Sequence, residues 1–438
     1  MLELLLAWLL LMLAITVMVA SRPAAGGALT LAYFVGLSLI HVPGLLPFAF
    51  SDLYLANAEA TKAGFELTLL GMAGFLLGAL VVRAVMRPAI PEAGMSAGTA
   101  QSFGRLGMRA FGFGIAAYFI LVPLSFSVPS LNSIASAMAT LLILGCWLML
   151  YGARLARDDG RTVAIIALLP LLPMATLVSG GFLGYGVYWV LSIVAFLFVV
   201  ARQRTFFYLA APIAIYLGLS LFVTYMGQRA GIRDLVWRER ATLVDRIDRA
   251  ATLVTDFRLL DLDSRSHVTA LDERLNQNAL VGAAIMHHEA GLSGFAYGAT
   301  VPIWALVPRA LWPDKPAVGG GLNLVSDFTG IRFAAGTSVG TGQVLEFYVN
   351  FGVPGVLAGF ILLGALLAGF DREIMRALAV GDMRVFLVHA MPGLTLLQPG
   401  GNLLEIVVAV VAAYVMALVV AQFGLLNGPR PARLAAGS

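Results

Sequence analysis

Long apolar runs separated by short polar stretches make up most of the chain. A helix needs about 20 apolar residues to cross the hydrocarbon core of a bilayer, and about eleven runs approach that length. The pattern therefore predicts an all-α polytopic membrane protein with about 11 transmembrane helices. The predicted spans are 2–20, 28–48, 65–86, 111–128, 133–153, 162–179, 183–201, 206–226, 352–370, 384–398 and 403–425.

Arginine gives these spans an orientation. With eleven alternating spans, the arginines of the short loops all fall on one side. The short loops on the opposite side contain a single basic residue, Lys62. By the positive-inside rule the arginine side is cytoplasmic. We therefore expect the N-terminus outside and the C-terminus inside. The arginines are Arg22, Arg83, Arg87, Arg105, Arg109, Arg154, Arg157, Arg161, Arg202, Arg204, Arg372, Arg376, Arg384, Arg430 and Arg433.

One long segment divides the chain into three parts. Residues 227–351 hold about half of the charged residues and fall on the outer side. Loops this long are usually functional or disordered, and helical periodicity argues against disorder here. We predict an N-terminal bundle of about eight spans (1–226), a large external loop carrying the active site (227–351) and a C-terminal bundle of about three spans (352–438).

The first half of this loop predicts two amphipathic helices. In 234–260 apolar residues recur at three-and-four spacing, with arginines and aspartates between them. Such a helix lies on the membrane or on the spans. A second helix is expected over 266–289. The apolar residues of the first are Leu235, Trp237, Leu243, Val244, Ile247, Ala251, Val254, Phe257 and Leu260.

Composition supports lipid as the solvent. Hydrophobic residues make up 60% of the chain and charged residues 12%, with a mean hydropathy of +0.90, whereas soluble domains carry about 25% charged residues. The isoelectric point near 9.3 does not indicate nucleic acid, because the basic residues lie between apolar runs. The single cysteine, Cys146, excludes an intrachain disulfide.

The second half of the loop, 291–352, combines glycines, cations and aromatic residues. Consecutive N–H groups in glycine turns can bind an anion, and Arg309, Lys315 and Arg332 flank these glycines. Prolines on both sides of Trp312 would hold Arg309 and Lys315 in fixed directions. Trp312 suits an interfacial anchor better than a sugar platform. The alternative is a structured cap with solvated charges.

Of the carboxylates, Glu346 is the strongest candidate for a chemical role. It lies just before the ninth predicted span, among apolar and aromatic residues. It suits a general base or a helix N-terminal charge that complements the dipole. His287 and His288 adjoin Glu289, but adjacent histidines point about 100° apart on a helix, so we expect no metal site there. No nucleotide-binding motif is present. His41, inside the second span, is expected to be a buried polar contact.

Four stretches together resemble the bacterial O-antigen and exopolysaccharide repeat-unit polymerases of the Wzy type. The resemblance covers mainly 265–360. The stretches are Arg274-Leu275-Asn276-Gln277, Phe295-Ala296-Tyr297-Gly298, Pro308-Arg309-Ala310-Leu311-Trp312-Pro313-Asp314-Lys315-Pro316 and Glu346-Phe347-Tyr348-Val349-Asn350-Phe351-Gly352.

This resemblance implies a C-type glycosyltransferase fold related to the O-antigen ligases. It implies transfer of a growing glycan from polyprenyl (undecaprenyl) diphosphate to the next lipid-linked unit, at the periplasmic face of the bacterial inner membrane, without metal or other cofactor. A chain-length regulator and a flippase are the implied protein partners. As base, Glu346 ranks first, followed by His288 and His287. The diphosphate-binding residues would be Arg274, Arg309, Lys315 and Arg332, and those contacting glycan or lipid Trp312, Tyr348, Asn350 and Tyr297.

Three other functions stay open at this point. An O-antigen ligase shares the fold and donor but uses a lipid A core acceptor. A transporter or flippase for lipid-linked sugars should show charged or broken helices in mid-membrane, whereas charge here is concentrated in the outer loop. A noncatalytic assembly scaffold is the third.

Overall fold

The computed structural model describes residues 1–51, 53, 55, 57–85, 97–125, 131–237, 241–297, 321–333 and 339–426, and within these ranges the chain is helical, without strands. The helices are α1 (Leu2–Ser21), α2 (Ala28–His41), α3 (Leu46–Phe50), α4 (Ala58–Val85), α5 (Ala97–Ala116), α6 (Val122–Ser125), α7 (Asn132–Ala156), α8 (Asp159–Leu168), α9 (Leu171–Gly180), α10 (Gly184–Val200), α11 (Thr205–Trp237), α12 (Leu243–Thr255), α13 (Arg265–Leu275), α14 (Gln277–Glu289), α15 (Gly321–Thr329), α16 (Gln343–Val380), α17 (Met383–Thr395) and α18 (Leu403–Gln422). Short turns of other helix types are η1 (Pro23–Ala25), η2 (Pro43–Leu45) and η3 (Ala117–Leu121).

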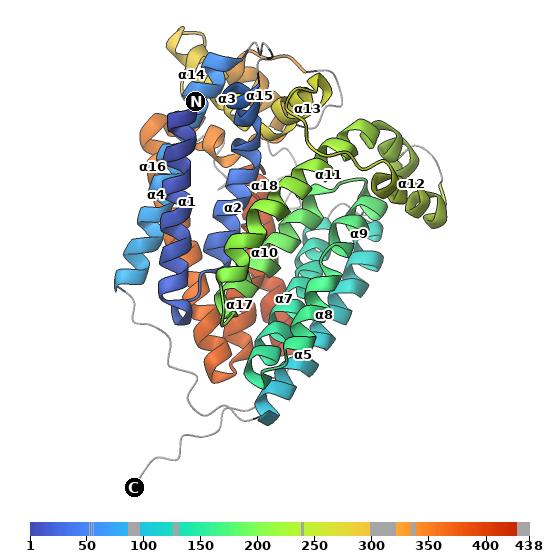
Figure 1. Ribbon diagram of the computed structural model, residues 1–438. Coiled ribbons are helices and arrows are strands. Elements are labelled where there is room, and N and C mark those ends of the chain that lie inside the picture. Colours follow the sequence, from blue (N-terminus) through green and yellow to red (C-terminus); the bar gives the residue numbers. More distant parts are fainter. Residues whose placement is uncertain are drawn as a thin grey trace.

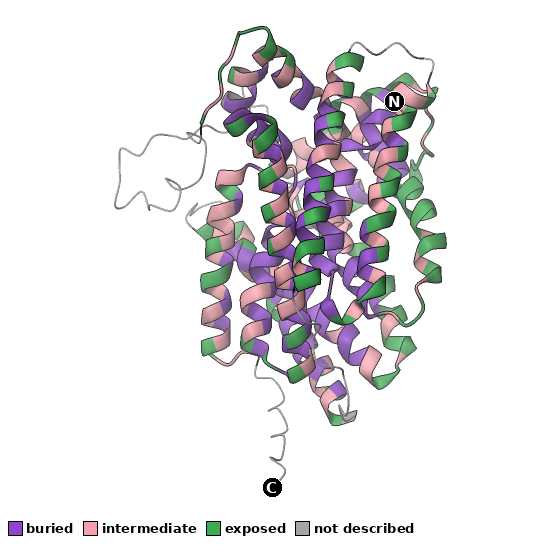
Figure 2. Ribbon diagram, turned by 90° about the vertical axis from the view of Figure 1, so that its left-hand side faces the viewer, coloured by how far each residue is buried: buried purple, intermediate pink, exposed green. Residues whose placement is uncertain are grey.

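Nine helical segments in the described part of the chain are long and apolar enough to cross a bilayer. Their outward faces carry exposed apolar side chains such as Leu6, Leu10 and Leu13 of α1. Figure 2 shows buried residues along the inward faces and exposed ones around the outside. This arrangement fits a solvent of lipid rather than water, and it supports a multi-pass membrane protein.

The count of about eleven full spans was too high. Each predicted span has a helix, but α10 has 17 residues and α17 has 13. At 1.5 Å per residue α17 is about 20 Å long, well short of the roughly 30 Å hydrocarbon core. α17 stops because Pro399, Gly400 and Gly401 follow closely in a non-helical turn. The predicted span 384–398 is therefore a short helix followed by a turn inside the bundle.

The two ends of the bundle differ. The helices α12, α13, α14 and α15 gather at one end, together with α3 and the N-terminus (Figure 1). We call this the cap end.

Two predicted helices of the loop are divided differently from expectation. The helix over 234–260 starts only at Leu243, because Leu235 and Trp237 belong to α11, and the helix over 266–289 is interrupted at Asn276.

The opposite end, which we call the arginine end, joins loops through guanidinium groups. Arg83 donates to the backbone oxygens of Gly26 and Arg22, at 3.0 and 2.8 Å. Arg202 donates to the oxygen of Arg154, at 3.3 Å, and Arg204 reaches the oxygen of Ala20 at 3.4 Å. The loop before α2, the last turn of α4 and the loops after α7 and α10 therefore meet at one end of the bundle, as the alternating pattern of arginines predicted.

A buried carboxylate caps α2 from another helix. α2 begins after Gly27, which has no side chain to cap it. Asp371 of α16 takes this role, accepting the N–H groups of Leu29 and Thr30, both at 2.9 Å, and the hydroxyl of Thr30 at 2.7 Å. A Cβ on Gly26 would lie 2.4 Å from the backbone oxygen of Asp371. The first N–H groups of a helix need such acceptors when they are buried.

Replacing Asp371 by alanine should lower the free energy of unfolding by about 1–3 kcal/mol, because buried donors lose their acceptors. The midpoint of thermal unfolding in detergent measures this. Asp382→Ala is the control, because Asp382 caps α17 at an exposed position, where water can replace the carboxylate. Equal midpoints for both variants would show that Asp371 does not hold α2.

Candidate functional site

α16 is folded back on itself near its start. Phe351 and Gly352 have non-helical angles, with φ −141° and +65°. The ring centroids of Phe347 and Phe360 are 5.5 Å apart, whereas thirteen residues span about 20 Å in a straight helix. Residues 343–350, the short arm, therefore pack antiparallel to the start of 353–380, the long arm. We call the two together the hairpin.

The sequence of the hairpin explains the reversal. Gly352 adopts a positive φ, which favours glycine. Gly355 and Gly359 leave room for the short arm, because Cβ atoms there would lie 2.7 Å from the backbone oxygen and from the ring of Phe347, respectively. Pro354 suits the first turn of the long arm, where a missing N–H costs nothing. The motif that begins at Glu346 is thus a turn between two helices.

The segment 295–297 completes the end of the short arm. The N–H of Ala296 donates to the oxygen of Val349 at 2.8 Å, and that of Tyr297 to the oxygen of Asn350 at 3.1 Å. In a continuous helix the oxygen of Asn350 would need an N–H from Pro354, which has none. Two stretches that carry the family resemblance, 295–298 and 346–352, are therefore in direct contact.

His288 lies at this junction. Its ring is 4.1 Å from that of Phe295 and 6.4 Å, edge on, from that of Tyr348. Its Nδ1 is 2.9 Å from the backbone oxygen of Ser293. A carbonyl oxygen only accepts, so Nδ1 carries a proton, and in the corresponding tautomer Nε2 is the acceptor. His288 is partly exposed. A histidine held in this way can accept a proton from a bound hydroxyl.

Glu346 lies inside the bundle, not at its surface. Its side chain is 1% exposed, and its carboxylate accepts the N–H of Leu403, the first residue of α18. A carboxylate at a helix N-terminus is stabilised by the dipole of that helix. The sequence suggested such a charge at the start of its own span, and the structure adds a bond to a second helix. Glu346 thereby joins the short arm to α18.

A layer of amides links the cap to the spans. The break at Asn276 lets Asn276 donate to Thr61 at 3.0 Å, and Asn278 donate to the backbone oxygen of His41 at 2.7 Å. His41 is buried, with Nδ1 2.6 Å from Oδ1 of Asn278, which confirms that it is a buried polar contact. A helix over 266–289 could not turn both amides inward, and this is why that prediction failed. The sequence showed Asn276 only as part of a motif.

Gln277 extends this layer to the hairpin. A Cβ on Gly342 would lie 2.3 Å from Oε1 of Gln277, and one on Gly400 would lie 3.1 Å from Nε2. The segment 398–400 in turn binds Gln343, whose N–H donates to the oxygen of Pro399 at 3.0 Å. The amide layer, the short arm and the start of α18 are thus one packed unit at the cap end. Four buried polar atoms described in this region have no hydrogen-bond partner, namely Nε2 of His41, Oδ1 of Asn276, Oε1 of Gln277 and Oγ1 of Thr341.

The cations proposed for diphosphate are distributed differently. Arg274 is in the last turn of α13, near Arg229 and Tyr225 of α11. Desolvation and the charge of Arg229 lower the pKa of Arg274. Arg332 is exposed, two residues beyond Gly330, where a Cβ would lie 3.1 Å from the ring of His287. Arg332 therefore lies near the histidine end of α14, whereas Arg274 lies near α11.

Several proposed residues have other placements. Tyr348 and Asn350 are buried in the short arm, and the amide of Asn350 donates to the oxygen of Glu346 at 2.7 Å. Tyr297 is 77% exposed. Arg309, Trp312 and Lys315 lie outside the described residues.

In the described ranges no three His, Cys, Asp or Glu side chains form a group that could hold a metal ion. Comparisons with protein-family models, curated proteins and solved structures give no match to the chain.

Proposed function

We propose that the protein polymerises lipid-linked oligosaccharide repeat units, moving the growing glycan from polyprenyl diphosphate to the next lipid-linked unit at the cap end. The observation that carries the proposal is the imidazole of His288, oriented by the oxygen of Ser293 and placed beside Phe295 and Tyr348. The two stretches that meet there are among those that resemble repeat-unit polymerases. On this proposal the cap end faces the periplasm and the arginine end the cytoplasm.

In the proposed reaction the anomeric carbon of the donor sugar exchanges its bond to the diphosphate for a bond to the acceptor. The acceptor hydroxyl oxygen bonds to the anomeric carbon of the donor sugar, and the bond from that carbon to the diphosphate oxygen breaks. The hydroxyl proton passes to Nε2 of His288, and the bonding electrons leave with the diphosphate. Arg332 suits the departing charge because guanidinium groups bind phosphate oxygens strongly. Arg309 and Lys315 complete the cation set in the proposal.

This assignment moves the base from Glu346 to His288. Glu346 is buried and already accepts the N–H of Leu403, so it suits a role in fixing the short arm. His288 is partly exposed and has a free lone pair, so it suits contact with a substrate hydroxyl. A base must come within hydrogen-bond reach of the proton that it takes. The exposed ring of Tyr297 provides a flat apolar face for a sugar.

A transporter for lipid-linked sugars is a second candidate, and the hairpin is the observation that favours it. Transporters often bind substrate where interrupted helices end inside the membrane. Here the short arm begins beside the turn 398–402, which follows the short helix α17. Both candidates predict binding of the same lipid-linked glycan, but only the polymerase releases polyprenyl diphosphate.

The test uses the full chain in liposomes with a purified polyprenyl-diphosphate-linked repeat unit. Glycan ladders on a gel, with matching release of polyprenyl diphosphate, would support the polymerase. Release that requires a lipid A core acceptor would reassign the protein as a ligase. Movement of the intact lipid-linked unit between leaflets without release would establish the transporter. If the protein neither releases polyprenyl diphosphate nor moves the lipid-linked unit, both proposals are overturned.

A further inference from the structure

α12 begins beyond the outer end of a very long helix. α11 has 33 residues, or about 50 Å, and exceeds the roughly 30 Å of the hydrocarbon core. α12 then starts with a capping box, in which Thr242 and Asp245 bond each other's side chains and N–H groups. Bonds from Thr242 lower the pKa of Asp245. The start of α12 is therefore well determined by local contacts.

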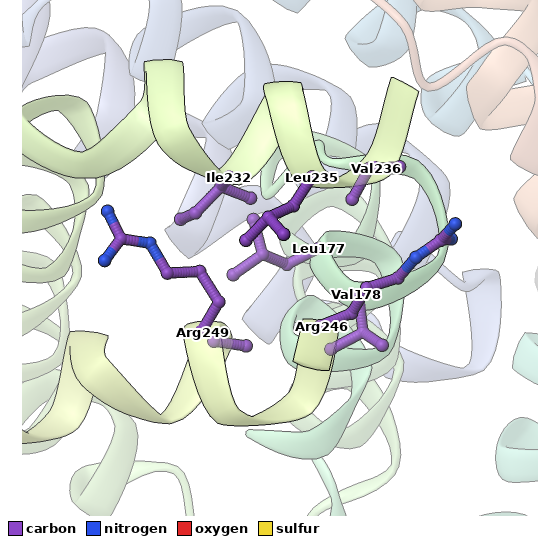
Figure 3. A pocket seen from close by; sticks show the side chains of 8 residues that line it. Leu177, Val178, Ile232, Leu235, Val236, Arg246 and Arg249 are labelled. Atoms are coloured by element: carbon purple, nitrogen blue, oxygen red, sulfur yellow. The ribbon is translucent and has the colours of Figure 1, made fainter. Parts of the chain in front are cut away.

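One side of α12 packs on the spans. Ala250 and Leu253 are buried together with Leu177 of α9 and Ile232 of α11. Arg246 and Arg249 border a small pocket between the three helices, and Figure 3 shows their guanidinium groups pointing away from its apolar lining in opposite directions. The arginine stems thus cover apolar surface. Nε of Arg246 is itself buried there, and the head of Arg249 lies against α11, since a Cβ on Gly231 would lie 2.8 Å from its Nη2. This side already has its partner within the chain.

A second side of α12 is apolar and exposed. Leu243, Ile247 and Val254 follow one another at four- and seven-residue spacing, which places them on one side of a helix. Their exposed fractions are 63%, 49% and 72%. A third side carries Asp245 and Asp248, both exposed. A helix with one side on protein, one apolar and one charged is suited to the boundary between lipid and water.

The apolar side of α12 continues into the surface of a span. After α12 the chain returns along α11: Arg258 donates its N–H to Thr224 at 3.0 Å, and Leu260 donates to Ser220 at 2.9 Å. Leu259 and Phe257 are exposed on this return. On α11 the return is bonded by Tyr216, whose hydroxyl donates to the oxygen of Leu260 at 3.2 Å. Ile213 and Leu217, within one turn of Tyr216, are exposed, and α11 is one of the candidate membrane spans. Lipid that covers α11 therefore also reaches α12.

We propose that α12 lies in the plane of the membrane surface at the cap end, with Leu243, Ile247 and Val254 among the lipid acyl chains. The occupant of this apolar side is the bilayer itself. Asp245 and Asp248 then face water, and the heads of Arg246 and Arg249 lie at headgroup level. α12 anchors the outer end of α11 and the start of the cap. This inference does not depend on the proposed reaction.

Spin labels on single cysteines test the placement. Cys146, the only cysteine, is buried and is first replaced by alanine. Labels are then attached to Ile247→Cys, Val254→Cys and, as the matched control, Asp248→Cys, each in the full chain reconstituted in phospholipid vesicles. We expect the ratio of oxygen to water-soluble nickel-complex accessibility to be several-fold higher at 247 and 254 than at 248, because oxygen partitions into acyl chains.

Two outcomes would overturn the proposal. Equal nickel accessibility at all three positions would place the apolar side in water. Exclusion of both oxygen and nickel at 247 and 254 would mean that protein covers this side, and spin–spin broadening would identify a second copy as that protein. Unchanged elution in size-exclusion chromatography shows that each labelled variant is folded.

Discussion

Replacing His288 by glutamine is expected to lower the rate of glycan transfer by about 100- to 10,000-fold, the usual contribution of a general base. Glutamine retains polar groups near Ser293 but cannot take the hydroxyl proton. Binding of the lipid-linked donor should change little, because in the proposed reaction the imidazole acts on the acceptor. The measurement is the initial rate of polyprenyl diphosphate release by the reconstituted protein, with donor binding determined separately.

Two matched variants show whether this effect belongs to His288. His287→Gln changes the neighbouring histidine, which packs against Gly330, and should keep most of the rate. Glu346→Gln should keep an acceptor for the N–H of Leu403 and lower the rate less than His288→Gln does. A larger loss for Glu346→Gln would return the role of base to the carboxylate, and a rate unaffected by His288→Gln would remove the histidine from the mechanism.

Replacing Gly355 by valine is expected to open the hairpin. The new Cβ would lie 2.7 Å from the backbone oxygen of Phe347, and a backbone atom cannot move aside as a flexible side chain can. Overpacking of this kind costs about 1–3 kcal/mol. Because the short arm carries Glu346 and Tyr348, transfer should fall together with stability. The midpoint of thermal unfolding and the rate of diphosphate release measure the two effects.

Gly369→Val is the control for the hairpin variant. Gly369 lies on the same long arm, and a Cβ there would meet nothing within 4 Å. Valine at 369 should therefore leave both the midpoint and the rate close to those of the unmodified protein. If Gly355→Val behaves in the same way, the two arms do not depend on their close packing.

The spans were predictable because lipid imposes a length on apolar helices. The run 2–20 became Leu2–Ser21, and 133–153 became Asn132–Ala156. The same reasoning failed for 384–398, because an apolar run does not reveal that it ends in a turn inside the bundle. It also missed the direction of the short arm, because hydropathy contains no sign of a reversal that depends on Gly352 and on the contact of Phe347 with Gly355.

The sequence singled out residues of the candidate site but did not show their contacts. Motifs singled out Glu346 and His288, and residue types suggested acid–base chemistry. The roles proposed for them depend on hydrogen bonds with the backbone groups of Ser293 and Leu403. The side chains of Ser293 and Leu403 give no sign of these bonds in the sequence. The amide layer was missed for a related reason. In the sequence, Asn276 and Asn278 are polar residues of the kind expected on the surface of a helix. Only the structure shows Thr61 and His41 beside them.

The junction between 295–297 and the short arm has a consequence for how such a protein can diversify. The cap is attached there by N–H groups of Ala296 and Tyr297, which every residue except proline possesses. The two hydrogen bonds therefore do not depend on which side chains stand at these positions. On the proposed function, the exposed side chain of Tyr297 is then a position where the contact with the sugar can change while the hydrogen-bonded backbone beneath stays the same.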